Sequence, residues 1–119
     1  MNTELLVNVI QFQAQLRILH WQTESFAEHM AFGRTYDALD DLFDKLIETY
    51  SGKYGRPKFG GVKSISFADY DTLKTETYLQ TVDDYFVDLF MASQDAELAN
   101  IRDEIRDSIQ TLKYLLTLK

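Results

Sequence analysis

The amino-acid sequence predicts an all-α fold in which four helices form one bundle. Three observations support this prediction. Apolar residues recur every three or four positions in four separate segments, which is the spacing of an amphipathic helix. Four of the five glycines and the only proline fall between residues 52 and 61, so one region interrupts the helical pattern. The length of 119 residues, 45% of them hydrophobic, suits a single domain, residues 1–119, with its own core.

The first two helices are expected over Thr3–Gln22 and from Phe26 to Tyr50. Ser25 can cap the second helix, and Glu28 can reach back to complete a capping box. The glycines and the proline that follow Tyr50 are expected to end this helix. The apolar stripes that define the two helices are Leu5, Val9, Phe12, Leu16 and Leu19, then Phe32, Tyr36, Leu39, Phe43, Leu46 and Tyr50.

A connection over residues 53–74, with a short helix near Ser66 to Tyr70, is expected to precede two further helices. The third is predicted from Glu76 to Ala92, and Asp95 is predicted to cap the fourth. Their apolar stripes are Leu79, Val82, Phe86, Leu89 and Phe90, then Leu98, Ile101, Ile105, Ile109, Leu112 and Leu116.

The lengths of the connections predict how the helices are joined. Short turns after the first and third helices make two antiparallel hairpins, whereas the middle connection is long enough to recross the bundle lengthwise. Two helical hairpins joined by one long crossover are the ferritin-like arrangement of a four-helix bundle.

Composition excludes several classes of function. The net charge of −7 argues against non-specific binding to DNA or to an anionic membrane, and no lysine-rich N-terminal tail is present. The sequence has no cysteine, which excludes disulfides and thiolate metal sites. It also shows no signal peptide and no apolar run that could span a membrane, so we expect a cytoplasmic protein.

Two histidines and an acidic segment are the candidate metal ligands. His20 and His29 are the only histidines, and Asp44 and Glu48 follow on the second helix. Imidazole nitrogen and carboxylate oxygen together suit zinc or iron. His29 and Glu48 would lie roughly 28 Å apart on one straight helix, so they cannot hold the same ion within one chain. A second copy packed antiparallel about a two-fold axis could bring them together, so we expect any metal site to be shared.

Asp37 and Asp40 lie on the same band of the second helix and are possible additional ligands. The alternative interpretation is structural. An acidic band beside an apolar stripe is usually a solvated helix face, and a histidine at a helix end usually packs or caps. Trp21 is then a half-buried aromatic that closes one end of the bundle.

These residues resemble the Dps-type mini-ferritins. The segment Arg17-Ile18-Leu19-His20-Trp21-Gln22 is similar to the end of the first helix in that family, and Asp44 and Glu48 follow His29 by 15 and 19 residues, as they do there. The segment from Ala96 to Ile105 also resembles the start of the last helix of the family. The resemblance implies a ferroxidase site between two-fold-related subunits in a homodimer or larger closed shell. It implies His20 and His29 from one chain, Asp44 and Glu48 from the other, and ferrous iron oxidised by peroxide or oxygen and stored.

Gly33 stands where the family usually carries a carboxylate. We therefore expect one tightly held divalent metal in each site, iron or else zinc or another divalent ion, and slow ferrous oxidation. Two alternatives stay open: a helical interaction protein that has lost the metal, and a metal-sequestration module without turnover.

Overall fold

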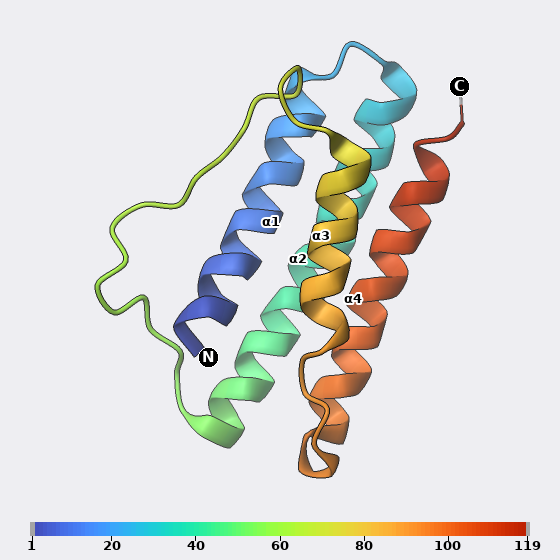
Figure 1. Ribbon diagram of the computed structural model, residues 1–119. Coiled ribbons are helices and arrows are strands. Elements are labelled where there is room, and N and C mark those ends of the chain that lie inside the picture. The colour runs from blue at the N-terminus through green and yellow to red at the C-terminus, as the bar shows by residue number, and fades with distance from the viewer. Residues whose placement is uncertain (1, 119) are drawn as a thin grey trace.

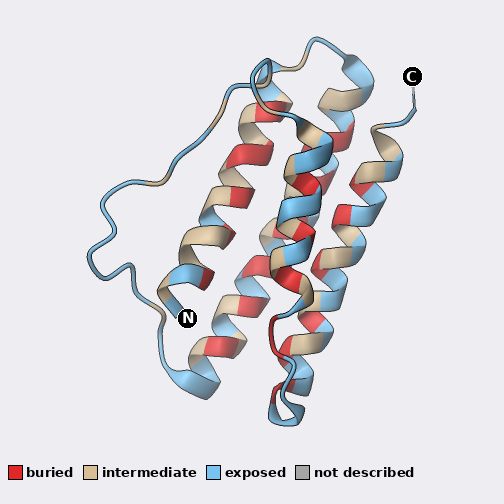
Figure 2. Cartoon of the chain, in the orientation of Figure 1, coloured by how far each residue is buried: buried red, intermediate tan, exposed pale blue. Residues whose placement is uncertain are grey.

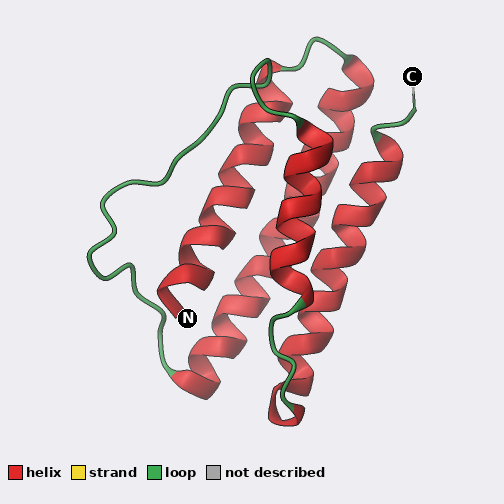
Figure 3. Cartoon of the chain, in the orientation of Figure 1, coloured by secondary structure: helices red, strands yellow, loops and turns green. Residues whose placement is uncertain are grey.

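Four α-helices make up almost all of the regular structure in the computed structural model, which describes residues 2–118. The helices are α1 (Asn2–Gln22), α2 (Phe26–Tyr54), α3 (Thr75–Val87) and α4 (Ala96–Leu115), and a short 3₁₀-helix η1 (Ser93–Asp95) precedes α4 (Figure 1). The described residues contain no strand, so the all-α prediction is confirmed (Figure 3). None of the described helices is both long enough and apolar enough to cross a membrane.

The helices pack as two hairpins, α1 with α2 and α3 with α4, and α2 also packs along α4. Their buried faces point toward one another, and their outer faces are exposed (Figure 2). The core consists of the predicted apolar stripes together with Ala31, and Tyr36, Val82 and Leu116 of these stripes are only partly buried. Its largest fully buried side chains are Phe12, Phe32, Phe43 and Phe86.

The connection between α2 and α3 runs beside α1 in extended form (Figure 1). The Gln15 side chain accepts a hydrogen bond from the Ala68 backbone N–H and donates one to the Ala68 carbonyl, both at 2.9 Å. Gln22 accepts in the same way from the Tyr70 N–H at 2.7 Å. These side chains take up the backbone groups that a helix would use, so the predicted short helix near Ser66 to Tyr70 is wrong.

Two helix ends differ from their predicted positions. The second helix extends one turn further, through Gly52, and ends at Tyr54; Gly55 follows as its C-cap with a φ of 92°, which favours glycine. The third helix ends at Val87 instead of Ala92, because the chain turns at Phe90, which has a φ of 59°. The turn still keeps Leu89 and Phe90 in the core, as the apolar stripe predicted.

Two predicted caps form differently from expectation. Ser25 does accept a hydrogen bond from the Glu28 N–H, at 3.2 Å, but the Glu28 carboxylate accepts from Thr23 and Tyr70 rather than reaching back to Ser25. Asp95 stands at the N-cap of α4 without capping it. Its carboxylate instead accepts a hydrogen bond from the Tyr54 hydroxyl, which ties the start of α4 to the end of α2.

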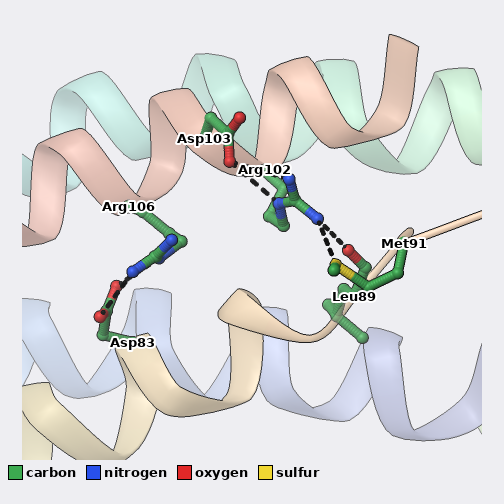
Figure 4. A network of polar contacts seen from close by, with 6 residues as sticks. All are labelled: Asp83, Leu89, Met91, Arg102, Asp103 and Arg106. Atoms are coloured by element: carbon green, nitrogen blue, oxygen red, sulfur yellow. Dashed lines mark hydrogen bonds and ion pairs between the residues drawn. The ribbon is translucent and has the colours of Figure 1, made fainter. Parts of the chain in front are cut away.

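The seam between α3 and α4 contains a bidentate ion pair (Figure 4). Arg106 Nε and Nη2 donate to the two carboxylate oxygens of Asp83 at 2.9 and 3.2 Å. Only 7% of the Asp83 side chain is exposed, against 34% for Arg106. In the same seam Arg102 donates to the Leu89 carbonyl, which holds the turn after α3 against α4. The polar groups of this seam are therefore satisfied by one another.

Candidate metal centre

His20, in the last turn of α1, and His29, in the first turn of α2, are stacked on each other. Their ring centroids lie 3.8 Å apart, and the rings are inclined by 18°. The turn between the helices is short because α2 begins at Phe26, four residues after α1 ends at Gln22. This tight turn brings the only two histidines of the sequence into direct contact.

Each histidine is fixed by a hydrogen bond to the backbone of the other. His20 Nδ1 lies 2.6 Å from the His29 carbonyl oxygen, and His29 Nδ1 lies 2.8 Å from the His20 carbonyl oxygen. A carbonyl oxygen can only accept, so Nδ1 carries the proton in both rings. Nε2 then has the free lone pair in a neutral ring, and neither Nε2 has a hydrogen-bond partner within residues 2–118. An Nδ1–H held by a backbone carbonyl is the arrangement common in metal-binding histidines.

Gly33 gives the His20 ring the space that it occupies. A Cβ at position 33 would lie 2.8 Å from His20 Cε1 and 3.0 Å from His20 Nδ1, closer than non-bonded atoms approach. Gly33 is also buried within α2, where glycine lowers helix stability by roughly 0.5–1 kcal/mol relative to alanine. The resemblance to mini-ferritins leads one to expect a carboxylate at this position, whereas in the structure any side chain there would displace His20.

Three exposed apolar residues lie close to the two histidines along the chain. Trp21 is 68% exposed, Phe26 77% and Met30 55%. The interpretation of Trp21 as a half-buried aromatic that closes the bundle is therefore wrong. The Phe26 ring lies 6.4 Å from the His29 ring, so the Phe26 side chain borders the pair directly.

The predicted acidic ligands lie along α2, away from the histidines. Asp37, Asp44 and Glu48 are exposed, and Asp40 is partly buried. Within residues 2–118 no three His, Asp or Glu side chains gather closely enough to hold a metal ion. The structure thus brings His20 and His29 together and leaves the four acidic candidates apart from them.

Asp40 is held by α1 in a shallow groove of about 590 Å³ that also contains Asp41 and Asp44. Gln13 donates a hydrogen bond to Asp40, and Arg17 lies 3.9 Å from it. Partial burial raises the pKa of the Asp40 carboxyl; Arg17 opposes this, and Asp37, Asp44 and Asp41 add to it. The sequence does not indicate these contacts of Gln13 and Arg17, because a contact between helices has no local sequence signal.

Comparison with known proteins gives a family and one described relative. The chain is 29% identical, over 116 residues, to an uncharacterised 14.6 kDa protein from the mobD-ri intergenic region of Enterobacteria phage T4. The match covers 98% of this chain and 88% of the phage protein. No solved structure matches the chain. None of these findings tests the resemblance to mini-ferritins, which stays a prediction. The model of DUF5856, a family of unknown function, matches residues 20–116, and the chain therefore belongs to that family.

Proposed function

We propose that the protein is a self-associating, Dps-like metal-binding protein whose site is completed by a second copy of the chain. One chain supplies His20 and His29, and its two-fold mate supplies Asp44 and Glu48. The observation that carries this proposal is the histidine pair: both Nδ1 atoms are engaged by backbone carbonyls, which leaves both Nε2 lone pairs without a partner within residues 2–118, and the stacked rings must turn relative to each other for both to bind one ion.

The arrangement of the helices supports the ferritin-like part of the proposal. The two hairpins are joined by a long connection that follows α1, with Thr3 bonded to the Lys58 carbonyl near one end and Gln22 to Tyr70 near the other. This is the connectivity expected of a ferritin-like bundle.

A second chain is required because two nitrogen ligands rarely hold a divalent ion alone. The exposed carboxylates on α2 can supply the additional ligands, because an antiparallel α2 of a second chain would bring them to the histidines. The exposed side chains of Trp21, Phe26 and Met30 would become buried in the same contact. Both the chemistry of the ligands and these exposed side chains therefore favour a homodimer, alone or as part of a larger closed shell.

Ferrous iron is the proposed substrate, and oxygen or peroxide is the electron acceptor. Two histidines, one aspartate and one glutamate would hold one ion tightly. Gly33 offers no further carboxylate, while Asp37 and Asp40 are the remaining candidates for a weaker second ion. We therefore expect slow oxidation, and zinc or another divalent ion as a competitor for the same ligands.

Titration calorimetry with ferrous iron under anaerobic conditions tests the proposal. His20→Ala and Glu48→Ala should each lose binding while the helical circular dichroism signal is unchanged. Glu104→Ala removes an exposed carboxylate from α4 and is the matched control, which should bind like the parent. Binding by both site variants at the parental affinity, or no binding by the parent, would exclude the proposed site.

The second candidate function is a helical interaction protein without a metal, which the exposed Trp21, Phe26 and Met30 favour. A metal-sequestration module is the third, and it differs from the first only in lacking turnover. A parent that binds no metal but still self-associates would support the second. Iron binding without any ferric product would support the third. In all three cases we expect the protein not to change the gel mobility of duplex DNA at physiological salt, because acidic residues outnumber basic ones by 19 to 12.

A further inference from the structure

The end of the connection between α2 and α3 is bonded to α1 through every second residue. Backbone groups of Ser66, Ala68 and Tyr70 each bond to a glutamine side chain of α1. The three glutamines are, in the same order, Gln11, Gln15 and Gln22. A period of two is that of an extended strand, in which neighbouring residues direct their backbone N–H and C=O groups to opposite edges. The side chains of α1 therefore occupy one edge of this part of the connection, residues 63–69, which we call the edge segment.

The other edge of this segment is open. Within residues 2–118, no hydrogen bond reaches the backbone N–H or C=O of Ile65 or Phe67. By the same alternation these groups point away from α1, and the segment lies on the outside of the bundle (Figure 1). The Phe67 side chain is 45% exposed, and Ile65 is partly exposed. An open edge of this kind is a template for pairing with another extended chain.

The order of residues in the edge segment favours a second copy of the same segment as the partner. In an antiparallel pair centred on Ser66, Ile65 of each chain lies opposite Phe67 of the other, and Lys63 lies opposite Asp69. The first is a pair of a β-branched and an aromatic residue and the second joins opposite charges, and both kinds of pair stabilise neighbouring strands. The residues with open backbone groups are also those that exchange hydrogen bonds in this register.

Other registers lack this match. Moving the centre by one residue places either Lys63 opposite Phe67 or Ile65 opposite Asp69. The carbonyl of Asp69 accepts hydrogen bonds from N–H groups of its own chain, so the strand-like part ends there. The sequence thus defines both the centre and the length of the pair.

We propose that the edge segments of two copies pair antiparallel about a two-fold axis at Ser66 and so form a two-stranded ribbon between two α1 helices. The glutamines of α1 fix each strand before it pairs, which lowers the entropy cost of association. Two short strands are marginally stable by themselves, so we expect the dimer to form reversibly. The contact contains none of the proposed metal ligands and is therefore independent of the proposed function.

Cysteine trapping tests the register, because the protein has no cysteine of its own. In the proposed pair the two copies of residue 66 lie on the axis with their Cα atoms roughly 4.5 Å apart, within the range of a disulfide. The two copies of residue 64 lie roughly 14 Å apart along the ribbon. Oxidation with diamide should therefore link Ser66→Cys into a dimer at least about tenfold faster than Ser64→Cys, the matched exposed control.

The trapping is carried out without metal, so that it reports on the ribbon alone. Ser66→Cys combined with His20→Ala should cross-link as fast as Ser66→Cys by itself. A rate for Ser66→Cys equal to that of Ser64→Cys would overturn the proposal, whatever the outcome of the iron titration.

Complementary charge changes test the pairing of Lys63 with Asp69. In the Ser66→Cys chain, Lys63→Asp places carboxylates opposite each other in a homodimer, and Asp69→Lys places ammonium groups opposite each other. A mixed dimer of the two variants has opposite charges at both pairs. We expect the mixed dimer, identified by its mass, to form about threefold to tenfold faster than either homodimer. Homodimers and mixed dimers in statistical proportion would contradict the proposed register.

Discussion

The seam between α3 and α4 pairs its charged groups with one another, whereas the face formed by α1 and α2 pairs Asp40 with Arg17 and leaves other carboxylates unpaired. In the seam, Asp83 and Arg106 satisfy each other, and Arg102 satisfies a backbone carbonyl (Figure 4). On the other face, among residues 2–118, Asp44 and Glu48 form no ion pair, and the histidines engage only each other's backbone.

This difference separates groups that hold the fold from groups that are available for binding. A charge that is buried and paired stabilises only when its partner is present, because an unpaired buried charge is costly. A charge left in water contributes little to stability and can be lost without unfolding the protein. Substitutions in the two regions should therefore give opposite patterns of stability and metal binding.

The largest effect on stability is expected from Arg106→Met. It leaves the buried Asp83 carboxylate without its partner, and we expect a loss of about 2–4 kcal/mol in the free energy of unfolding. Asp83→Asn should lower the free energy of unfolding by less than Arg106→Met does, because the more exposed Arg106 left without its partner can be hydrated. Urea unfolding of both variants measures this order, and the reverse order would show that the pair is not held as described.

Gly33→Ala should affect binding more than stability. The new Cβ displaces the His20 ring, so the contact with His29 is lost and metal affinity should fall at least about tenfold. The higher helix propensity of alanine offsets part of the contacts that are lost. The free energy of unfolding should therefore change by less than about 1 kcal/mol. Calorimetry and urea unfolding on the same sample separate these effects, and unchanged affinity would contradict the role given to Gly33.

The smallest effect is expected from Asp40→Asn, and it should depend on pH. A carboxyl with a raised pKa contributes stability below its ordinary value of 3.8, and this contribution is lost as the pH rises through the folded-state pKa. At pH 7 the free energy of unfolding of the variant should therefore be higher than that of the parent. The difference should be only a few tenths of a kcal/mol, because the Asp40 carboxyl is partly exposed and screened by solvent. The advantage should vanish below the ordinary pKa. A constant difference across that range would point to a cause other than ionisation.

The sequence predicted much of the fold because helical periodicity and turn residues are local signals. It placed the start of α2 at Phe26 and nearly all of the core correctly. The conformation of residues 66–70 and the role of Asp95 depend on contacts with α1 and α2, which no local pattern reports. The sequence places His20 and His29 on either side of one short turn, but the stacking of their rings is a property of the folded chain. The space that Gly33 provides for His20 is a three-dimensional property, although a glycine inside a long helix was a signal that could have indicated it.

The central claim, that the site is shared between two copies, is tested most directly by mixing two inactive variants. One chain carries His20→Ala and His29→Ala, and the other carries Asp44→Ala and Glu48→Ala; neither should bind ferrous iron alone. In a heterodimer purified with two different tags, one of the two sites keeps all four ligands, because the histidines come from one chain and the carboxylates from the other. We expect about half of the parental metal stoichiometry in that heterodimer. No recovery of binding, or a strictly monomeric parent in light scattering, would contradict the shared site.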